Sequence, residues 1–146
     1  MRLYGTMSID QDGVLKIGGV RTDDLVEDYG TPLIVVDEKE IESNIEQYQK
    51  GFENYSGKSR VIYASKAFSN RTLYRILNNK GLSLDVVSGG ELYTAIQSGF
   101  PTEKIFFHGN NKLPAEIKMA LDKNIGGFFI YNMQEARLLN KLANVK

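Results

Sequence analysis

The chain has 146 residues, of which 42% are hydrophobic and 25% are charged, and its 18 basic and 18 acidic side chains leave no net charge. These proportions are typical of an ordinary globular domain and exclude a disordered chain. Because a neutral chain has no overall field to attract nucleic acid or an anionic membrane, we expect neither as a partner, and any anionic ligand must be held by a local site.

Residue content also limits the metal chemistry and the compartment. Cysteine is absent, which excludes disulfides and thiolate metal sites. His108 is the one histidine, and no cluster of acids surrounds it in the sequence, so we expect no metal site. The N-terminus has no apolar stretch that resembles a signal peptide, and the apolar runs are far shorter than the roughly 18 residues of a membrane span. These features indicate a cytoplasmic protein.

Residues 1–30 differ from the rest of the chain. Two short strand-like stretches flank Asp12-Gly13, a pair that strongly favours a β-hairpin turn. Thr22 is then expected to cap a short helix that runs to Tyr29 and ends at Gly30. We therefore predict an N-terminal β-hairpin segment that is an appendage to the array that follows.

From residue 31 onward, a short apolar strand followed by an amphipathic helix repeats about five times. The strands are predicted at Leu33–Asp37, Arg60–Lys66, Leu82–Ser88, Lys104–His108 and Gly127–Tyr131. Their β-branched and aromatic content suits buried parallel strands. Asp37, Ser88 and Asn132 each precede a glutamate by three residues, a spacing that caps the first turn of a helix, and Pro114 suits a first helical position.

This alternation predicts an α/β fold with right-handed βαβ units and a parallel sheet over residues 31–146. By itself it does not distinguish an open doubly wound sheet from a (β/α)8 barrel. About five units are also too few for a closed barrel, which typically needs about 250 residues.

Ligands of parallel α/β proteins gather at the C-terminal ends of the strands. Several polar side chains of four successive units fall there, so the fold would place them along one rim. They are Lys66, Asp85 with Ser88, His108 with Asn110 and Asn111, and Asn132.

Each of these residues has a structural and a functional interpretation. A lysine in the position of Lys66 usually leaves the sheet for solvent, whereas a partly desolvated amine there can form a Schiff base with a carbonyl. Asp85 interrupts an apolar strand and must be paired, either with a structural partner or in orienting Lys66 or a cofactor. His108 is either a hydrogen-bonded strand-end residue or part of a site. Gly89-Gly90 is a weak phosphate-binding signal, which we interpret as allowing helix and sheet to approach closely.

Three motifs, in this order, resemble the diaminopimelate decarboxylases, a branch of the pyridoxal-phosphate (PLP) decarboxylases with an alanine-racemase-like barrel. They are Tyr63-Ala64-Ser65-Lys66-Ala67, Leu84-Asp85-Val86-Val87-Ser88-Gly89-Gly90-Glu91-Leu92 and Phe107-His108-Gly109-Asn110-Asn111-Lys112. Short segments between Leu3 and Leu33 are also similar to this branch. The likeness thus covers essentially the whole chain.

The resemblance implies that residues 31–146 are the first part of a PLP-binding (β/α)8 barrel and that residues 1–30 join a C-terminal β domain. It implies that Lys66 is the catalytic lysine that holds PLP as a Schiff base. Asp85 and His108 then line the cofactor cavity, and Ser88 and Asn110 lie on the same rim as further cofactor contacts. The implied activity is a carbon–carbon lyase, which converts the amino acid meso-diaminopimelate to L-lysine in lysine biosynthesis.

Complete members of this family are longer. The resemblance therefore implies a truncated chain that lacks the glycine-rich phosphate cradle, the acidic partner of the pyridine nitrogen and the β domain with its cysteine-bearing segment. Such a chain is expected to be inactive alone and to form a homodimer when full length. Other readings stay open: a related decarboxylase of ornithine, arginine or a carboxylated polyamine, a non-catalytic PLP-binding barrel protein, and an inert partial domain.

Overall fold

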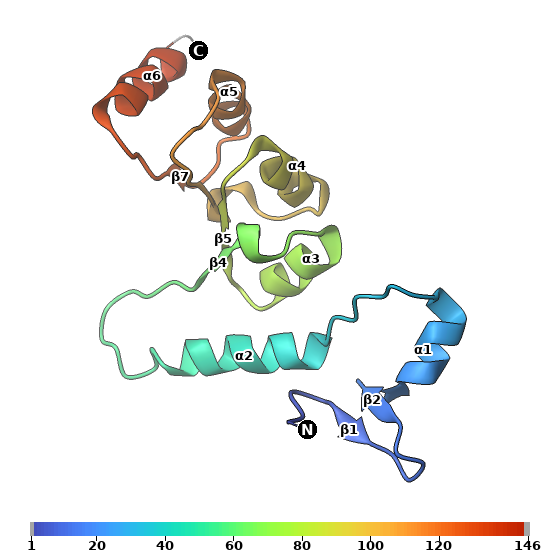
Figure 1. Cartoon of the computed structure of the whole chain (residues 1–146). Coiled ribbons are helices and arrows are strands. Elements are labelled where there is room, and N and C mark those ends of the chain that lie inside the picture. Colours follow the sequence, from blue (N-terminus) through green and yellow to red (C-terminus); the bar gives the residue numbers. More distant parts are fainter. Residues whose placement is uncertain (1, 145–146) are drawn as a thin grey trace. The chain divides into compact units, whose positions relative to one another are not determined.

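The computed structural model describes residues 2–144. The chain forms two compact units, residues 1–56 and residues 57–146 (Figure 1). No helix of the described residues is long and apolar enough to cross a membrane.

The first unit begins with a three-stranded antiparallel sheet in the order β1-β2-β3. Its strands are β1 (Ser8–Ile9), β2 (Leu15–Ile17) and β3 (Val20–Arg21). The predicted hairpin at Asp12-Gly13 joins β1 to β2, and Asp10 stabilises this turn by accepting hydrogen bonds from the Asp12 and Val14 N–H groups at 3.0 and 2.9 Å. Helix α1 (Thr22–Tyr29) follows and ends at Gly30 as predicted, although its N-cap is Arg21 rather than Thr22.

Helix α2 (Glu38–Lys50) completes the first unit, and Asp37 connects it to the hairpin segment. The Asp37 carboxylate accepts the predicted capping bond from the Glu40 N–H at 3.2 Å. It also accepts bonds from the Thr6 hydroxyl at 2.6 Å and the Thr6 N–H at 3.0 Å. These bonds from Thr6 hold the pKa of Asp37 below its ordinary value, because they favour the charged carboxylate.

The strand predicted at Leu33–Asp37 is wrong for this structure. Residues 33–37 have no regular secondary structure, and within the described chain they belong to no sheet. Ile34 is accordingly 85% exposed. An apolar, β-branched segment is suited to a strand, yet a strand exists only where its N–H and C=O groups pair with a neighbouring backbone.

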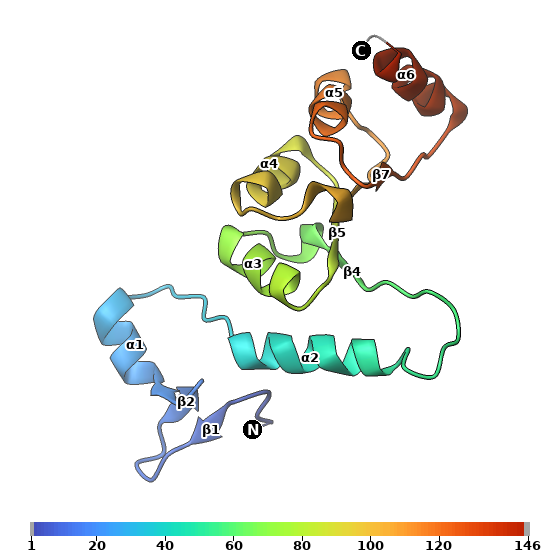
Figure 2. The same cartoon turned by 180° about the vertical axis from the view of Figure 1, so that it is seen from behind.

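The second unit contains the other four predicted strands in one parallel sheet with the order β4-β5-β6-β7. In chain order its elements are β4 (Ile62–Ala64), the 3₁₀ turn η1 (Ser65–Ala67), α3 (Arg71–Asn79), β5 (Ser83–Val86), α4 (Gly89–Gln97), the 3₁₀ turn η2 (Thr102–Lys104), β6 (Ile105–Phe107), α5 (Pro114–Asp122), β7 (Gly127–Phe128) and α6 (Met133–Ala143). Consecutive strands are neighbours, and both views show α3 to α6 following one another along the same side of the sheet (Figures 1 and 2). This is the arrangement of a barrel wall, since a doubly wound sheet reverses its strand order and carries helices on both faces.

The core of the second unit lies between this sheet and its helices. Leu84, Val86, Ile105 and Phe107 are fully buried on the helical side. The alternate positions Ala64, Asp85, Phe106 and Gly127 are opposite one another in register across the four strands. Because side chains alternate between the faces of a strand, these positions point to the side that the helices do not cover. The polar Asp85 is thus explained by its face of the sheet.

Candidate functional site

The candidate site starts at Lys66, which lies in the turn η1 directly after β4. Its side chain is exposed, and no hydrogen bond or ion pair to another described residue engages its amine. The chain itself therefore does not provide the partial desolvation expected for this lysine. What it does provide is a free amine at the C-terminal end of the first strand of the sheet.

Asp85 and His108 come from neighbouring strands and contact each other. His108 Nδ1 lies 3.3 Å from Asp85 Oδ2, and the Asp85 side chain is 18% exposed. The other oxygen, Asp85 Oδ1, is buried and has no hydrogen-bond partner among the described residues. Ala64, two residues before Lys66, is directly opposite Asp85 in the register of β4 and β5. The fold therefore brings an unsatisfied carboxylate oxygen to the strand next to Lys66.

His108 is held by its backbone and by an aromatic neighbour. Its N–H donates to the Val86 carbonyl at 2.8 Å, which continues the β5–β6 pairing by one residue. Its ring packs against Phe129, with ring centroids 5.1 Å apart. Gly109 then turns the chain with φ of 96°, and a Cβ there would lie 3.2 Å from the Val87 carbonyl. The ring of His108 thus lies between Asp85 and the segment that follows β7.

Ser88 is occupied in helix capping. Its hydroxyl accepts a hydrogen bond from the Glu91 N–H at 3.2 Å at the start of α4. The next N–H, that of Gly89, donates to Glu116 Oε1 at 2.6 Å, and Glu116 Oε2 accepts from the Leu113 N–H at 2.8 Å. Glu116 therefore takes the Gly89 N–H, one of the donors that a phosphate-binding turn would use. A Cβ on Gly89 would lie 3.1 Å from Glu116, so Gly89 makes room for this carboxylate rather than for the sheet.

The remaining predicted rim residues are polar groups on the two loops that follow. Asn110 and Asn111 are exposed in the loop after β6. Asn132 caps α6 as predicted, because its side chain accepts a bond from the Glu135 N–H at 2.9 Å. These asparagines follow the ends of β6 and β7, and no contact joins them to the Asp85–His108 pair among the bonds of the described residues.

The sequence did not predict the structural role of Lys112, the last residue of the third motif. Its side chain is 1% exposed, and its Nζ donates to the carbonyls of Gly109 and Phe129 and to Glu135 Oε1, at 2.7, 2.8 and 2.5 Å. Burial alone would raise the pKa of Glu135, but hydrogen bonds from Lys112 and the Tyr131 N–H outweigh it and hold the pKa below its ordinary value. The one sequence feature that pointed to Lys112 is its place at the end of the third motif. The spacing from Lys112 to Glu135 does not indicate a pair.

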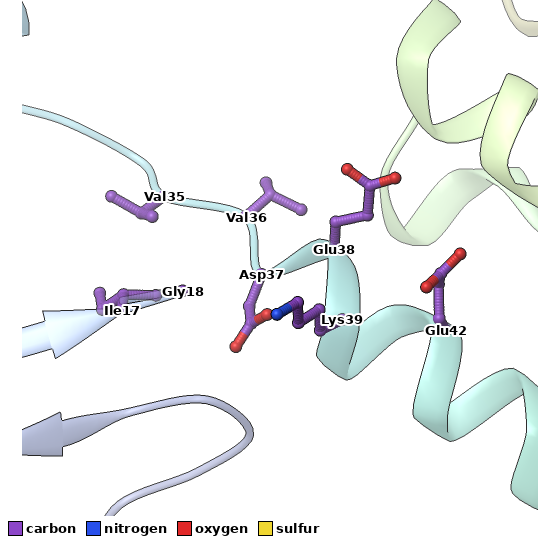
Figure 3. Close-up of a pocket in the computed structure, with 8 residues that line it drawn as sticks. All are labelled: Ile17, Gly18, Val35, Val36, Asp37, Glu38, Lys39 and Glu42. Atoms are coloured by element: carbon purple, nitrogen blue, oxygen red, sulfur yellow. The ribbon is translucent and has the colours of Figure 1, made fainter. Parts of the chain in front are cut away.

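A separate hollow of about 410 Å³ lies on the first unit (Figure 3). It is lined by Ile17, Gly18, Val35, Val36, Asp37, Glu38, Lys39 and Glu42. Its apolar lining comes from Ile17 of β2 and from Val35 and Val36 of the unpaired segment, and the Asp37 carboxylate beside it is already bound by Thr6. None of the strand-end residues of the sheet lines this hollow. No group of three potential metal ligands occurs among the residues that the structure describes.

Comparison with known proteins agrees with this arrangement. Residues 38–146 match the family model described as pyridoxal-dependent decarboxylase, pyridoxal binding domain. The chain is 45% identical over 146 residues to the diaminopimelate decarboxylase of Bacillus methanolicus and 48% identical over 142 residues to that of Bacillus subtilis. These matches cover 100% and 97% of the chain but 34% and 32% of the relatives. The chain therefore spans about a third of the length of the curated relatives it matches.

Solved structures show the same similarity. The crystal structure of the diaminopimelate decarboxylase from M. jannaschii in complex with L-lysine matches with a TM-score of 0.88 at 40% identity, over 96% of this chain and 33% of that one. The lysine/ornithine decarboxylase from Vibrio vulnificus complexed with cadaverine matches with a TM-score of 0.68 at 24% identity, over 82% and 32% of the two chains, which is a likeness of fold alone. The predicted fold class, a partial (β/α)8 barrel, is confirmed.

Proposed function

Since the chain belongs to the pyridoxal-dependent decarboxylases, we propose that it supplies the lysine-bearing part of a longer enzyme that decarboxylates meso-diaminopimelate to L-lysine. The observation that carries the proposal is the row of functional groups at the strand ends: the free amine of Lys66 and, on the next strand, the unpartnered Asp85 Oδ1. The identity of 45% and 48% to diaminopimelate decarboxylases supports this substrate.

The groups present fit PLP at its aldehyde end. Lys66 offers a primary amine, which is the group that forms a Schiff base with an aldehyde. Asp85 Oδ1 offers a buried acceptor that lacks a donor, an arrangement that is costly unless a further group satisfies it. At the start of α4, N–H groups donate to Ser88 and Glu116; Glu116 also caps α5, and Asn132 caps α6. We propose that the phosphate is held elsewhere in the longer protein.

When bound, PLP supplies an electron-poor ring that takes up the electron pair left as CO2 departs. The residues of this chain do the holding and the proton handling. The Lys66 amine would hold the cofactor and, when not bonded to it, could carry a proton. The contact with His108 engages Asp85 Oδ2 and leaves Oδ1 to accept a hydrogen bond. The ring of His108 lies on one side of this carboxylate, whose side chain is 18% exposed.

The finer assignments form part of the same proposal. Ser88 and Asn110 are proposed as further cofactor contacts on the rim, Ser88 while it caps α4. Residues 1–30 are proposed to join a β domain of the longer protein. That protein is proposed to act as a homodimer in the cytoplasm. The 146-residue chain alone is proposed to be inactive.

The test is CO2 release from meso-diaminopimelate by the full-length protein that carries these residues, supplied with PLP. We expect turnover of about 1 s⁻¹ or faster, and much lower rates with ornithine, arginine or a carboxylated polyamine. Preference for one of these other substrates would replace the proposed function with that of a related decarboxylase. A protein that binds PLP and releases no CO2 from any of them would instead be a PLP-binding barrel protein.

Asp85→Ala is expected to lower turnover of the full-length enzyme by about tenfold or more. The reason is that the variant removes the acceptor next to Lys66 and the partner of His108 together. Asp85→Asn serves as the matched variant, since it keeps the size and one acceptor but not the charge. Unchanged kcat together with an unchanged visible spectrum of the PLP-loaded protein would reduce Asp85 to a structural role.

A further inference from the structure

Lys112 is a buried cation whose bonding capacity is fully used. An ammonium group has three hydrogens, and Nζ of Lys112 donates to three acceptors: the carbonyls of Gly109 and Phe129 and the carboxylate of Glu135. Its side chain is 1% exposed. A buried charge is tolerated when it is paired and hydrogen-bonded in this way, and the arrangement is strongly disfavoured once a partner is removed.

The three acceptors come from separate segments around His108. Gly109 is the residue after His108, so the first bond fixes the loop that leaves β6. Phe129 carries the ring that packs against His108, and the second bond holds the carbonyl of this residue at the segment that leaves β7. Glu135 lies in the first turn of α6, and its other oxygen accepts from the Tyr131 N–H at 2.7 Å. Lys112 therefore joins the two loops between which the His108 ring lies.

The backbone pairing of His108 does not by itself hold the His108 ring in place. The bond from its N–H to the Val86 carbonyl fixes its main chain, but not the turn at Gly109 or the place of the Phe129 ring. The Phe129 N–H also pairs with the Phe107 carbonyl at 2.9 Å, so the segment after β7 stays attached to β6 without Lys112. What the loss of Lys112 removes is the cation that ties the Gly109 turn to the Phe129 carbonyl, on the side of the His108 ring away from Asp85. The 3.3 Å contact between His108 and Asp85 then becomes one of several available arrangements.

We propose that Lys112 is a positioning residue for His108: by joining the loop after β6 to the segment after β7, it holds the His108 ring against Asp85. Lys112 touches neither the cofactor nor the substrate in this role. The expected effect of the His108 position on PLP binding rests on the proposed function, in which Asp85 and His108 border PLP.

The first measurement is hydrogen–deuterium exchange of the full-length protein, followed by mass spectrometry of its peptides. In Lys112→Met we expect exchange to rise by about tenfold or more in peptides of residues 109–113 and 129–132, and to stay unchanged in those of residues 62–67. Lys118→Met is the matched control, because Lys118 is an exposed lysine of α5. Unchanged exchange at residues 109–113 would overturn the positioning role, whatever the fate of the proposed function.

The second measurement is the dissociation constant of PLP in a double-mutant cycle with His108→Ala. We expect Lys112→Met to weaken PLP binding by about fivefold or more in the natural background and to have no further effect when His108 is alanine. If Lys112→Met acted independently of His108, its fold-change in the PLP dissociation constant would multiply that of His108→Ala in the double variant. That result would contradict the proposal.

Glu135→Gln keeps the proposal testable if Lys112→Met does not fold. It removes the carboxylate charge while keeping one oxygen acceptor, and it is expected to give the same pattern of exchange and of non-additivity with a smaller size. An effect of Lys112→Met or Glu135→Gln on exchange, together with unchanged PLP binding in His108→Ala, would support the positioning role and would remove His108 from the proposed cofactor site. The two ideas therefore fail in distinguishable ways.

Discussion

Replacing Lys66 with alanine is expected to abolish decarboxylation by the full-length enzyme, with a loss in kcat of about 10⁴-fold or more. Lys66 is an exposed, unengaged amine at the end of β4, and no hydrogen bond of the described residues depends on it. Its removal should therefore leave the fold intact while it removes the point of cofactor attachment. Measurement of CO2 release, beside a far-ultraviolet circular dichroism spectrum, separates these two effects.

Lys58→Ala is the matched control, since Lys58 is an exposed lysine shortly before the same strand. It should retain turnover close to that of the natural protein. Borohydride reduction of the PLP-loaded protein followed by peptide mapping should place the pyridoxyl group on Lys66. Its recovery on Lys80, Lys104 or Lys112 would refute the assignment.

Gly126→Ala is expected to destabilise the folded protein by about 3 kcal/mol or more. A Cβ on Gly126 would lie 2.3 Å from the carbonyl oxygen of Glu103, 3.0 Å from the carbonyl carbon of the same residue and 3.1 Å from the Ile105 oxygen. All of these atoms are backbone, so no side-chain rotation relieves the overlap. To accept the methyl group, the start of β7 must move away from β6, which also weakens the bond from the Gly126 N–H to the Thr102 carbonyl.

Gly127→Ala provides the control at the next residue. There a Cβ would lie 3.4 Å from the nearest atom, a ring carbon of Phe106, which is an ordinary contact with a side chain that can shift. We expect its cost to be below about 1 kcal/mol. The comparison is made from urea unfolding midpoints of the full-length protein. Equal midpoints for the two variants would show that the approach of Gly126 to Glu103 is not tight in solution.

Much of the second unit could be predicted because the signals were local. Helix caps depend on residues three apart, and the caps at Asp37, Ser88 and Asn132 formed where their spacing placed them. The strands β4 to β7 follow from short apolar runs, and their ends place Lys66 and His108 on one rim. The fold class and the candidate residues can thus be predicted from segments of a few residues.

The exceptions concern partners that are distant in sequence. The segment of residues 33–37 has a strand-like composition, but strand pairing requires a second backbone, and the described chain does not place one beside it. The interpretation that Gly89 lets helix and sheet approach closely is likewise wrong, because the group for which it makes room is Glu116, 27 residues away.

The sequence by itself determined where α2, α4 and α6 begin, the four segments that form the parallel sheet and the polar residues that end those strands, since each depends on neighbours along the chain. Only the tertiary structure decided which of these residues meet. The register of β4, β5 and β6 sets Asp85 opposite Ala64 and brings His108 to its carboxylate, and a buried ion pair joins Lys112 to Glu135. The physical reason is that charge pairing and desolvation act between neighbours in space, and the local pattern of a sequence does not encode which distant groups become neighbours.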